Sequence, residues 1–169
     1  MPHPLVDQLV FSRSEFIRAI QGISEEDAQK RILPMNCISW NVGHLAWQEQ
    51  KYYLTYSRGI TLLPNIQKDF AKGAAASTPS LKEMLEAWGV ITREEDSWLK
   101  DVSNKLLLQP VVLDGKSMEF TYGNVILRTI YHYWYHTGEN CAIRQMLGHK
   151  DLPSFVGDLD SKAPYRPEE

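Results

Sequence analysis

The chain has 169 residues, of which 43% are hydrophobic and 23% charged, so we expect one globular domain over residues 1–169. Its net charge of −3, from 18 basic and 21 acidic residues without a long Lys/Arg run, argues against nucleic acid as a partner. No apolar run approaches the ~20 residues that cross a bilayer, so we expect no membrane partner. The first residues lack the pattern of a signal peptide, and Cys37 and Cys141 belong to no motif, which favours a cytoplasmic location.

Helical periodicity dominates the first part of the chain. Hydrophobic residues at helical spacing predict a first helix over residues 5–20. Ser24 is suited to cap a short helical piece that stops before Pro34. A long second helix is then expected from Ser39, as its N-cap, to Gly59.

The next part combines a connector with a third long helix. Residues 60–78 contain proline, glycine and small residues, and we expect them to form an irregular connection. Either Thr78 or Ser80 can cap the third helix. A heptad-like apolar stripe then continues to Val102, which suits the seam of a helical bundle.

Residues 106–122 interrupt the helical rhythm before the last helix. Asp114 and Gly115 between β-prone arms predict a tight turn, and Pro110 restricts its arm to an edge. A fourth helix is expected over residues 122–147. The elements together predict an all-α fold, a four-helix bundle with a small hairpin or extended loop between its third and fourth helices.

Two of the five histidines lie four positions apart in HYWYHTGEN, residues 132–140. On a helix, His132 and His136 would be ~40° and ~6 Å apart, which lets two imidazoles reach one metal ion. Glu139 would share their stripe, only ~20° from His132. The alternative is that these histidines are polar packing residues in an aromatic helix.

A transition-metal site needs at least a third ligand, and His44 in the middle of the second helix is the interior candidate. Its face also carries Trp40, Trp47 and Gln48, within ~60° of it. These three residues are candidates to line a binding pocket, although core packing is the simpler interpretation of the tryptophans. Likewise, an isolated interior histidine is often a hydrogen-bonded core residue.

The segments SWNVGHLAWQEQKYYL and HYWYHTGENCAIRQMLG resemble the DinB-like family of metal-dependent proteins, also called the YfiT-like fold. That family has one histidine early in its second helix, in HLA-x-x-E, and an H-x3-H-x-G-Q motif on its fourth. His44 matches the first motif, and His132, His136 and Gly138 match the second. Glu139 stands where glutamine is usual. The resemblance covers nearly the full length of the chain.

The resemblance implies a bundle of unusual connectivity whose three histidines hold a divalent ion such as zinc or nickel. It also implies a small-molecule substrate, because relatives are similar to S-transferases that use mycothiol, bacillithiol or glutathione. An ion held by neutral histidines could activate a thiol, for group transfer, or water, for hydrolysis.

Glu139 is the candidate catalytic residue. It could orient an imidazole, serve as a fourth ligand or act as a general base. The alternative is a carboxylate that is solvated or paired with Arg128.

Two rival functions need different features. A di-iron carboxylate bundle would need Glu-x-x-His on two helices, and the sequence contains no such motif. A non-enzymatic metal-binding or stress-response bundle, in which the ion is structural, is compatible with the same histidines.

Two features favour a homodimer. The resembling proteins are often dimeric. In addition, aromatic residues occur on more faces of the second and fourth helices than one core stripe requires, among them Tyr52, Tyr53 and Tyr56.

Overall fold

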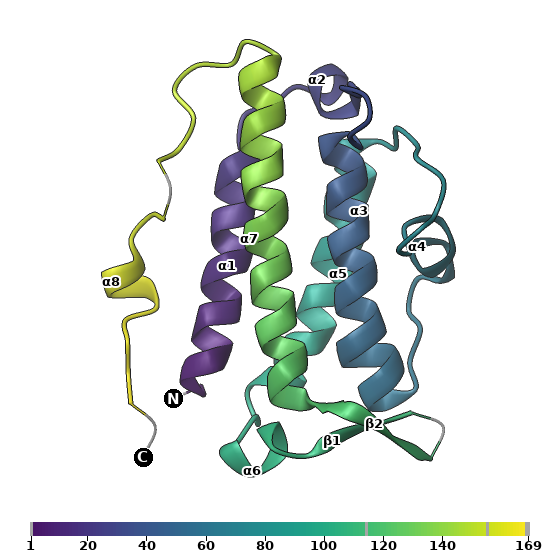
Figure 1. Cartoon of the computed structure of the whole chain (residues 1–169), viewed down its shortest axis with the longest axis vertical. Helices are drawn as coiled ribbons and strands as arrows, with labels where there is room; N and C mark the ends of the chain where they lie inside the picture. The colour runs from purple at the N-terminus through teal and green to yellow at the C-terminus, as the bar shows by residue number, and fades with distance from the viewer. Residues whose placement is uncertain (1, 114, 155, 168–169) are drawn as a thin grey trace.

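The computed structural model describes residues 2–113, 115–154 and 156–167. Four long helices form a bundle (Figure 1). They are α1 (Pro4–Ile20), α3 (Ile38–Glu49), α5 (Leu81–Leu99) and α7 (Tyr122–Met146). The all-α bundle predicted from the sequence is therefore confirmed. No helix in the described part of the chain is long and apolar enough to pass through a membrane.

The connectivity of the bundle follows from a long crossover (Figure 1). After α3 the chain returns along the outside of the bundle, so α3 and α5 run in the same direction. Helices α1 and α7 run in the opposite direction. Short elements complete the fold: α2 (Glu25–Gln29), η1 (Gln50–Tyr56), α4 (Pro64–Asp69), α6 (Asn104–Leu107) and α8 (Leu159–Lys162).

Side-chain caps set several helix boundaries. Ser24 caps α2, Ser80 caps α5 and Thr121 caps α7, each by accepting a hydrogen bond from a backbone N–H in the first turn. Of the two caps considered for α5, the structure therefore uses Ser80 rather than Thr78. Gly148, with φ of 85°, follows the C-terminus of α7 in the left-handed region that glycine adopts readily.

The second long helix differs from the prediction at its start and in the type of its last turns, whereas the helical turns stop at Gly59 as predicted. It begins at Ile38, so Ser39 lies inside it and is not the cap. Cys37 occupies the N-cap position without a side-chain hydrogen bond to the backbone. After Glu49 the helix widens into the π-helix η1. Hydrophobic spacing could not reveal this change, because a π turn adds only one residue to the turn.

Other differences concern the short elements. The connector expected to be irregular contains α4, which begins with Pro64 at its first turn, where proline is favoured. Helix α5 ends at Leu99, and Val102 is buried beyond its end. The apolar stripe thus continued past the helix, because the chain stays against the core after the helical turns stop.

The predicted hairpin is present as β1 (Pro110–Leu113) and β2 (Lys116–Thr121). The strands pair antiparallel, with an irregularity between Pro110 and Val112. Asp114, half of the predicted turn, lies outside the described residues, and Gly115 has φ of 74°. The hairpin packs at the end of the bundle where α7 begins (Figure 1).

The tyrosines behind the expected homodimer do not share one surface. Tyr52 and Tyr53 are buried in the core, so they are not available for association. Tyr131 and Tyr135 on α7 are 65% and 69% exposed. Tyr56 is only partly buried, so the homodimer stays a prediction whose aromatic surface is reduced to Tyr56 and residues of α7.

Candidate metal centre

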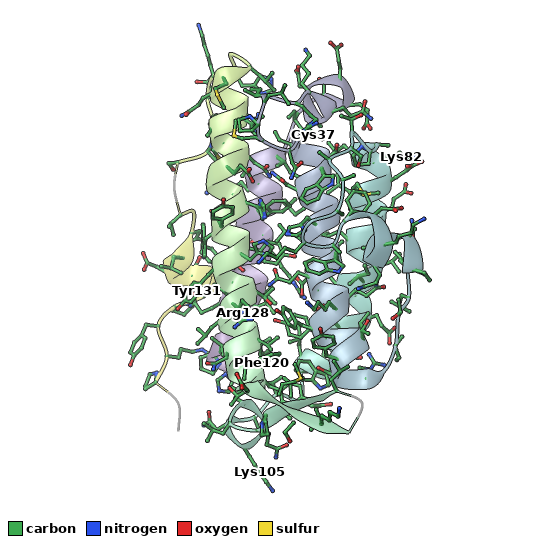
Figure 2. The ribbon with its side chains drawn as sticks, turned by 45° about the vertical axis from the view of Figure 1, so that its right-hand side comes forward. Cys37, Lys82, Lys105, Phe120, Arg128 and Tyr131 are labelled. Carbon is green, nitrogen blue, oxygen red and sulfur yellow. The ribbon has the colours of Figure 1, made fainter. Side chains whose placement is uncertain are left out.

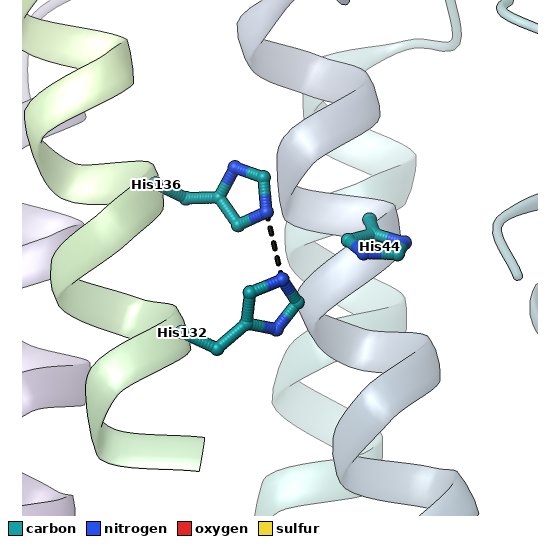
Figure 3. A group of neighbouring side chains, drawn as sticks. All are labelled: His44, His132 and His136. Carbon is teal, nitrogen blue, oxygen red and sulfur yellow. Dashed lines mark hydrogen bonds between the residues drawn. The ribbon is translucent and has the colours of Figure 1, made fainter. Parts of the chain in front are cut away.

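Three imidazoles meet between α3 and α7 (Figure 3). The ring centroid of His44 lies 5.0 Å from that of His132 and 5.5 Å from that of His136. One ring nitrogen from each histidine lies within 4.8 Å of the others. The i, i+4 pair on α7 and the mid-helix histidine on α3 thus converge as predicted.

Each imidazole has its Nδ1 atom held by a different acceptor. The donor–acceptor pairs are His44 Nδ1 to the Phe70 carbonyl oxygen (2.7 Å), His136 Nδ1 to Glu139 Oε2 (2.6 Å) and His132 Nδ1 to Gln48 Oε1. Because carbonyl, carboxylate and amide oxygens only accept, Nδ1 carries the proton in each ring. The lone pair that remains in each ring is on Nε2.

These lone pairs fit a metal ion. The Nε2 atoms of His132 and His136 are 2.9 Å apart. Two lone pairs that face each other at this distance repel unless a proton or cation lies between them. The observed 2.9 Å is the length of an ordinary hydrogen bond, and two nitrogens that share a zinc ion would be ~3.4 Å apart, so the two rings would separate by about half an ångström to hold the ion. Neutral imidazoles also suit zinc and nickel chemically.

Burial keeps two of the imidazoles, His44 and His132, neutral. Desolvation lowers the pKa of His44 to about 4. Desolvation, followed by the neighbouring His136 and His44, lowers the pKa of His132 to about 3. Both rings are therefore uncharged at neutral pH, the form in which imidazole binds a metal.

Two predicted pocket residues hold His44 between them. The indole of Trp40 stacks on the imidazole at 4.9 Å between centroids, and that of Trp47 at 5.1 Å. Trp47 and Gln48 line the adjacent cavity, whereas Trp40 is not among its lining residues. Trp40 therefore packs against the ligand ring rather than lining a pocket.

Glu139 lies on the far side of His136 from the Nε2 atoms. Its Oε2 accepts the Nδ1–H of His136 and also an N–H of Asn41 at 3.0 Å. The group of candidate ligands among the described residues contains the three histidines and not this carboxylate. Nor does Glu139 pair with Arg128, which instead contacts Tyr52 at 3.4 Å. Asn41 was not predicted, because nothing in its sequence context marks it as a partner of Glu139.

A cavity of about 570 Å³ opens beside the histidines. Its lining residues come from α3, η1, the segment after α4, and α7: His44, Trp47, Gln48, Lys51, Tyr52, Lys72, Arg128, Tyr131, His132 and Tyr135. A volume in this range suits a small-molecule ligand. Lys72 could not be predicted here, since it comes from a connector whose path the sequence does not specify.

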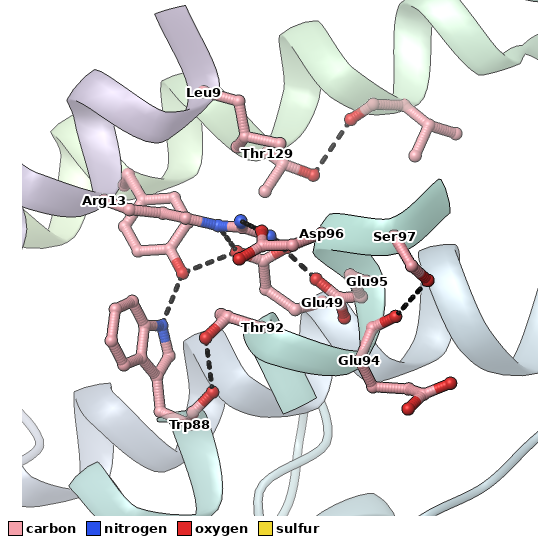
Figure 4. Close-up of polar contacts among 12 residues, drawn as sticks. Leu9, Arg13, Glu49, Trp88, Thr92, Glu94, Glu95, Asp96, Ser97 and Thr129 are labelled. Atoms are coloured by element: carbon pink, nitrogen blue, oxygen red, sulfur yellow. Dashed lines mark hydrogen bonds and ion pairs between the residues drawn. The ribbon is translucent and has the colours of Figure 1, made fainter. Parts of the chain in front are cut away.

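A buried ion network links the helices behind the site (Figure 4). Arg13 of α1 binds both carboxylate oxygens of Glu49 at 2.7 and 2.8 Å, and one oxygen of Glu95 at 2.7 Å. The hydroxyl of Tyr133 on α7 donates to Glu49 on α3 at 2.7 Å. Glu49 and Tyr133 each directly follow a site residue in the chain, so the network fixes α3 and α7 at the level of the histidines.

Comparison with known protein families identifies a family for this chain. The sequence profile of the DinB superfamily matches residues 8–139, a span that contains all three histidines and ends at Glu139. No curated protein matches the chain.

Proposed function

The chain belongs to the DinB superfamily, and from this premise we propose that it is a metal-dependent enzyme that activates a low-molecular-weight thiol or water. It would act as an S-transferase in the first case and as a hydrolase in the second. The observation that carries the proposal is the convergence of ring nitrogens from His44, His132 and His136 beside a cavity of about 570 Å³, which His44 and His132 line. A cavity at the ligands leaves room for a substrate, as catalytic sites require.

The ion, zinc or nickel, would be held by His44, His132 and His136. When bound, it would supply Lewis-acid chemistry that lowers the pKa of a thiol or water. The surrounding residues prepare the ligands for it. Gln48 and Glu139 fix the protonation of their histidine partners, and burial excludes solvent from the rings.

For Glu139 we propose a positioning role in place of a directly catalytic one. Its carboxylate contacts His136 through Nδ1, the nitrogen that faces away from the other imidazoles. It can therefore influence the reaction through the orientation and basicity of that ring.

A structural ion is the second candidate. It would be favoured by a closed set of four protein ligands. The described residues bring together three, and a substrate-sized cavity adjoins them, so the catalytic proposal has the stronger support.

The test is a reaction screen on protein purified without an affinity tag and then loaded with zinc or nickel. Thiol transfer from glutathione, bacillithiol or mycothiol to an electrophilic acceptor is measured beside ester hydrolysis. We expect metal-dependent turnover in one assay, lost in His136→Ala and kept in His149→Ala, which removes a histidine outside the site. Full metal retention without turnover in any assay would favour the structural candidate.

A further inference from the structure

Three basic side chains surround the cavity beside the histidines. They are Lys51 of η1, Lys72 of the segment after α4, and Arg128 of α7. No carboxylate of the described residues lines this cavity. Within the same part of the chain, none of the three cations forms an ion pair with an aspartate or glutamate. The cavity is therefore locally positive in a chain whose net charge is −3.

Aromatic rings hold two of these cations in place. The Nζ atom of Lys51 lies 4.9 Å from the ring centroid of Trp47 and 5.4 Å from that of Tyr52. The guanidinium of Arg128 lies 5.5 Å from the ring centroid of Phe120, and Figure 2 shows these two residues near the start of α7. Contacts with aromatic rings orient a cation but leave its charge available to a ligand.

We propose that this cavity binds a small molecule with at least two carboxylates. The inference rests on the proposed function, since it identifies the substrate class of the same site. A guanidinium can bind a carboxylate through two parallel hydrogen bonds, and the two ammonium groups add point charges beside it. Because His44 and His132 line the same cavity, a thiol on such a molecule can face the histidines while its carboxylates face Lys51, Lys72 and Arg128.

The proposal distinguishes between the thiols implied by the family according to their charge. Glutathione and bacillithiol carry carboxylates, whereas mycothiol carries none. The positive cavity therefore favours the first two as co-substrates. Aromatic side chains also line the cavity, and their faces suit the uncharged part of such a ligand.

A calorimetric titration of the metal-free protein tests the basic residues by themselves. Succinate is compared with succinamide, its uncharged analogue, at low and high salt. We expect succinate to bind at least roughly tenfold more tightly at low salt, and added salt to weaken it. Equal binding of the two compounds would overturn the proposal.

Variants without these charges test whether the three basic residues cause the preference for succinate. The triple variant Lys51→Gln, Lys72→Gln, Arg128→Gln should weaken succinate binding by at least about tenfold. Lys72→Gln alone, at an exposed position, should weaken it by a smaller factor without disturbing the fold. Lys105→Gln removes a charge on α6 that does not line the cavity, and it should bind succinate as the unmodified chain does. An unchanged affinity in the triple variant would also overturn the proposal.

A second titration uses the zinc-loaded protein with mercaptosuccinate and with 2-mercaptoethanol. We expect the dicarboxylate thiol to bind about tenfold more tightly, and this preference to vanish in the triple variant. If both thiols bind equally, the proposal fails while the proposed function stands. If the protein holds no zinc, the proposed function fails, and the succinate titration still decides whether the cavity selects anions.

Discussion

Glu139 accepts hydrogen bonds from His136 and Asn41, and at the scale of single residues these two contacts define its part in the site. A glutamine can still accept through its amide oxygen, and the resembling family has glutamine at this position. We therefore expect Glu139→Gln to keep its metal with at most a modest loss of affinity. Glu139→Ala should lose the ~10–100-fold typical of such supporting contacts.

Competition for zinc with a chromophoric chelator measures both variants. Glu86→Gln, at an exposed position on α5, controls for the loss of one negative charge. If Glu139→Gln lost its metal as completely as a histidine variant, Glu139 would be a ligand and its positioning role would be wrong.

Glu95 makes a second prediction at the residue scale. Burial, and next the charge of Glu49, raise the pKa of Glu95 well above its ordinary value, against the opposing effect of Arg13. The folded state therefore binds a proton that the unfolded state has already released above about pH 5, so Glu95 lowers stability as the pH rises. Replacing it with glutamine removes this penalty and keeps the shape. In urea unfolding between pH 5 and 8, the free energy of unfolding of Glu95→Gln should increase relative to that of the unmodified chain as the pH rises. If the difference between the two free energies stayed constant over this range, the raised pKa of Glu95 would be contradicted.

Whereas Glu95→Gln should raise the stability of the fold at neutral pH, Arg13→Leu should lower it. It leaves the buried Glu49 carboxylate without its cation, an arrangement that typically costs about 3–5 kcal/mol. Urea unfolding of Arg13→Leu at pH 7, with the unmodified chain and Glu95→Gln beside it, would measure this loss, and an Arg13→Leu variant as stable as the unmodified chain would contradict it.

At the scale of elements, Gly43 determines how closely α3 approaches the segment that ends α4. A Cβ atom at this position would lie 2.6 Å from Cδ1 of Phe70 and 2.8 Å from Sδ of Met84. Phe70 also supplies the carbonyl that accepts the hydrogen bond from His44. We therefore expect Gly43→Ala to shift this carbonyl, to destabilise the fold by about 1–3 kcal/mol, and to weaken zinc binding.

Gly138 provides the matched control. It lies on α7 between His136 and Glu139, and an added Cβ would meet nothing within 4 Å. Gly138→Ala should leave stability unchanged or raise it by about 0.5–1 kcal/mol. Equal zinc affinity of Gly43→Ala and the unmodified chain would show that the contact with Phe70 does not position His44.

Local chemistry made most helices predictable. The apolar period and the caps Ser24 and Ser80 identified α2 and α5, and Gly148 marked the end of α7. The π-helix was not predictable, because its side-chain pattern resembles that of an α-helix over seven residues. Helix α4 was missed because its six residues are too few for a clear hydrophobic period.

At the scale of the whole molecule, the three candidate ligands could be predicted from the sequence, but the residues that contact them from other parts of the chain could not. His132 and His136 are one helical turn apart, and His44 is the interior histidine of another helix. Sequence spacing and family resemblance therefore both identified the three residues. Their supporting contacts join distant parts of the fold. The Phe70 carbonyl and Lys72 reach the site only because the crossover returns beside α3, and no local pattern encodes such a path.

The central claim is that His44, His132 and His136 hold one divalent ion. Elemental analysis of the protein purified without an affinity tag, with His136→Ala and His149→Ala beside it, tests this claim most directly. We expect about one zinc or nickel ion per chain in the unmodified protein and in His149→Ala, and almost none in His136→Ala, because two imidazoles make a weak site. A metal-free unmodified protein that takes up no added zinc, or a His136→Ala variant with a full complement of metal, would contradict the claim.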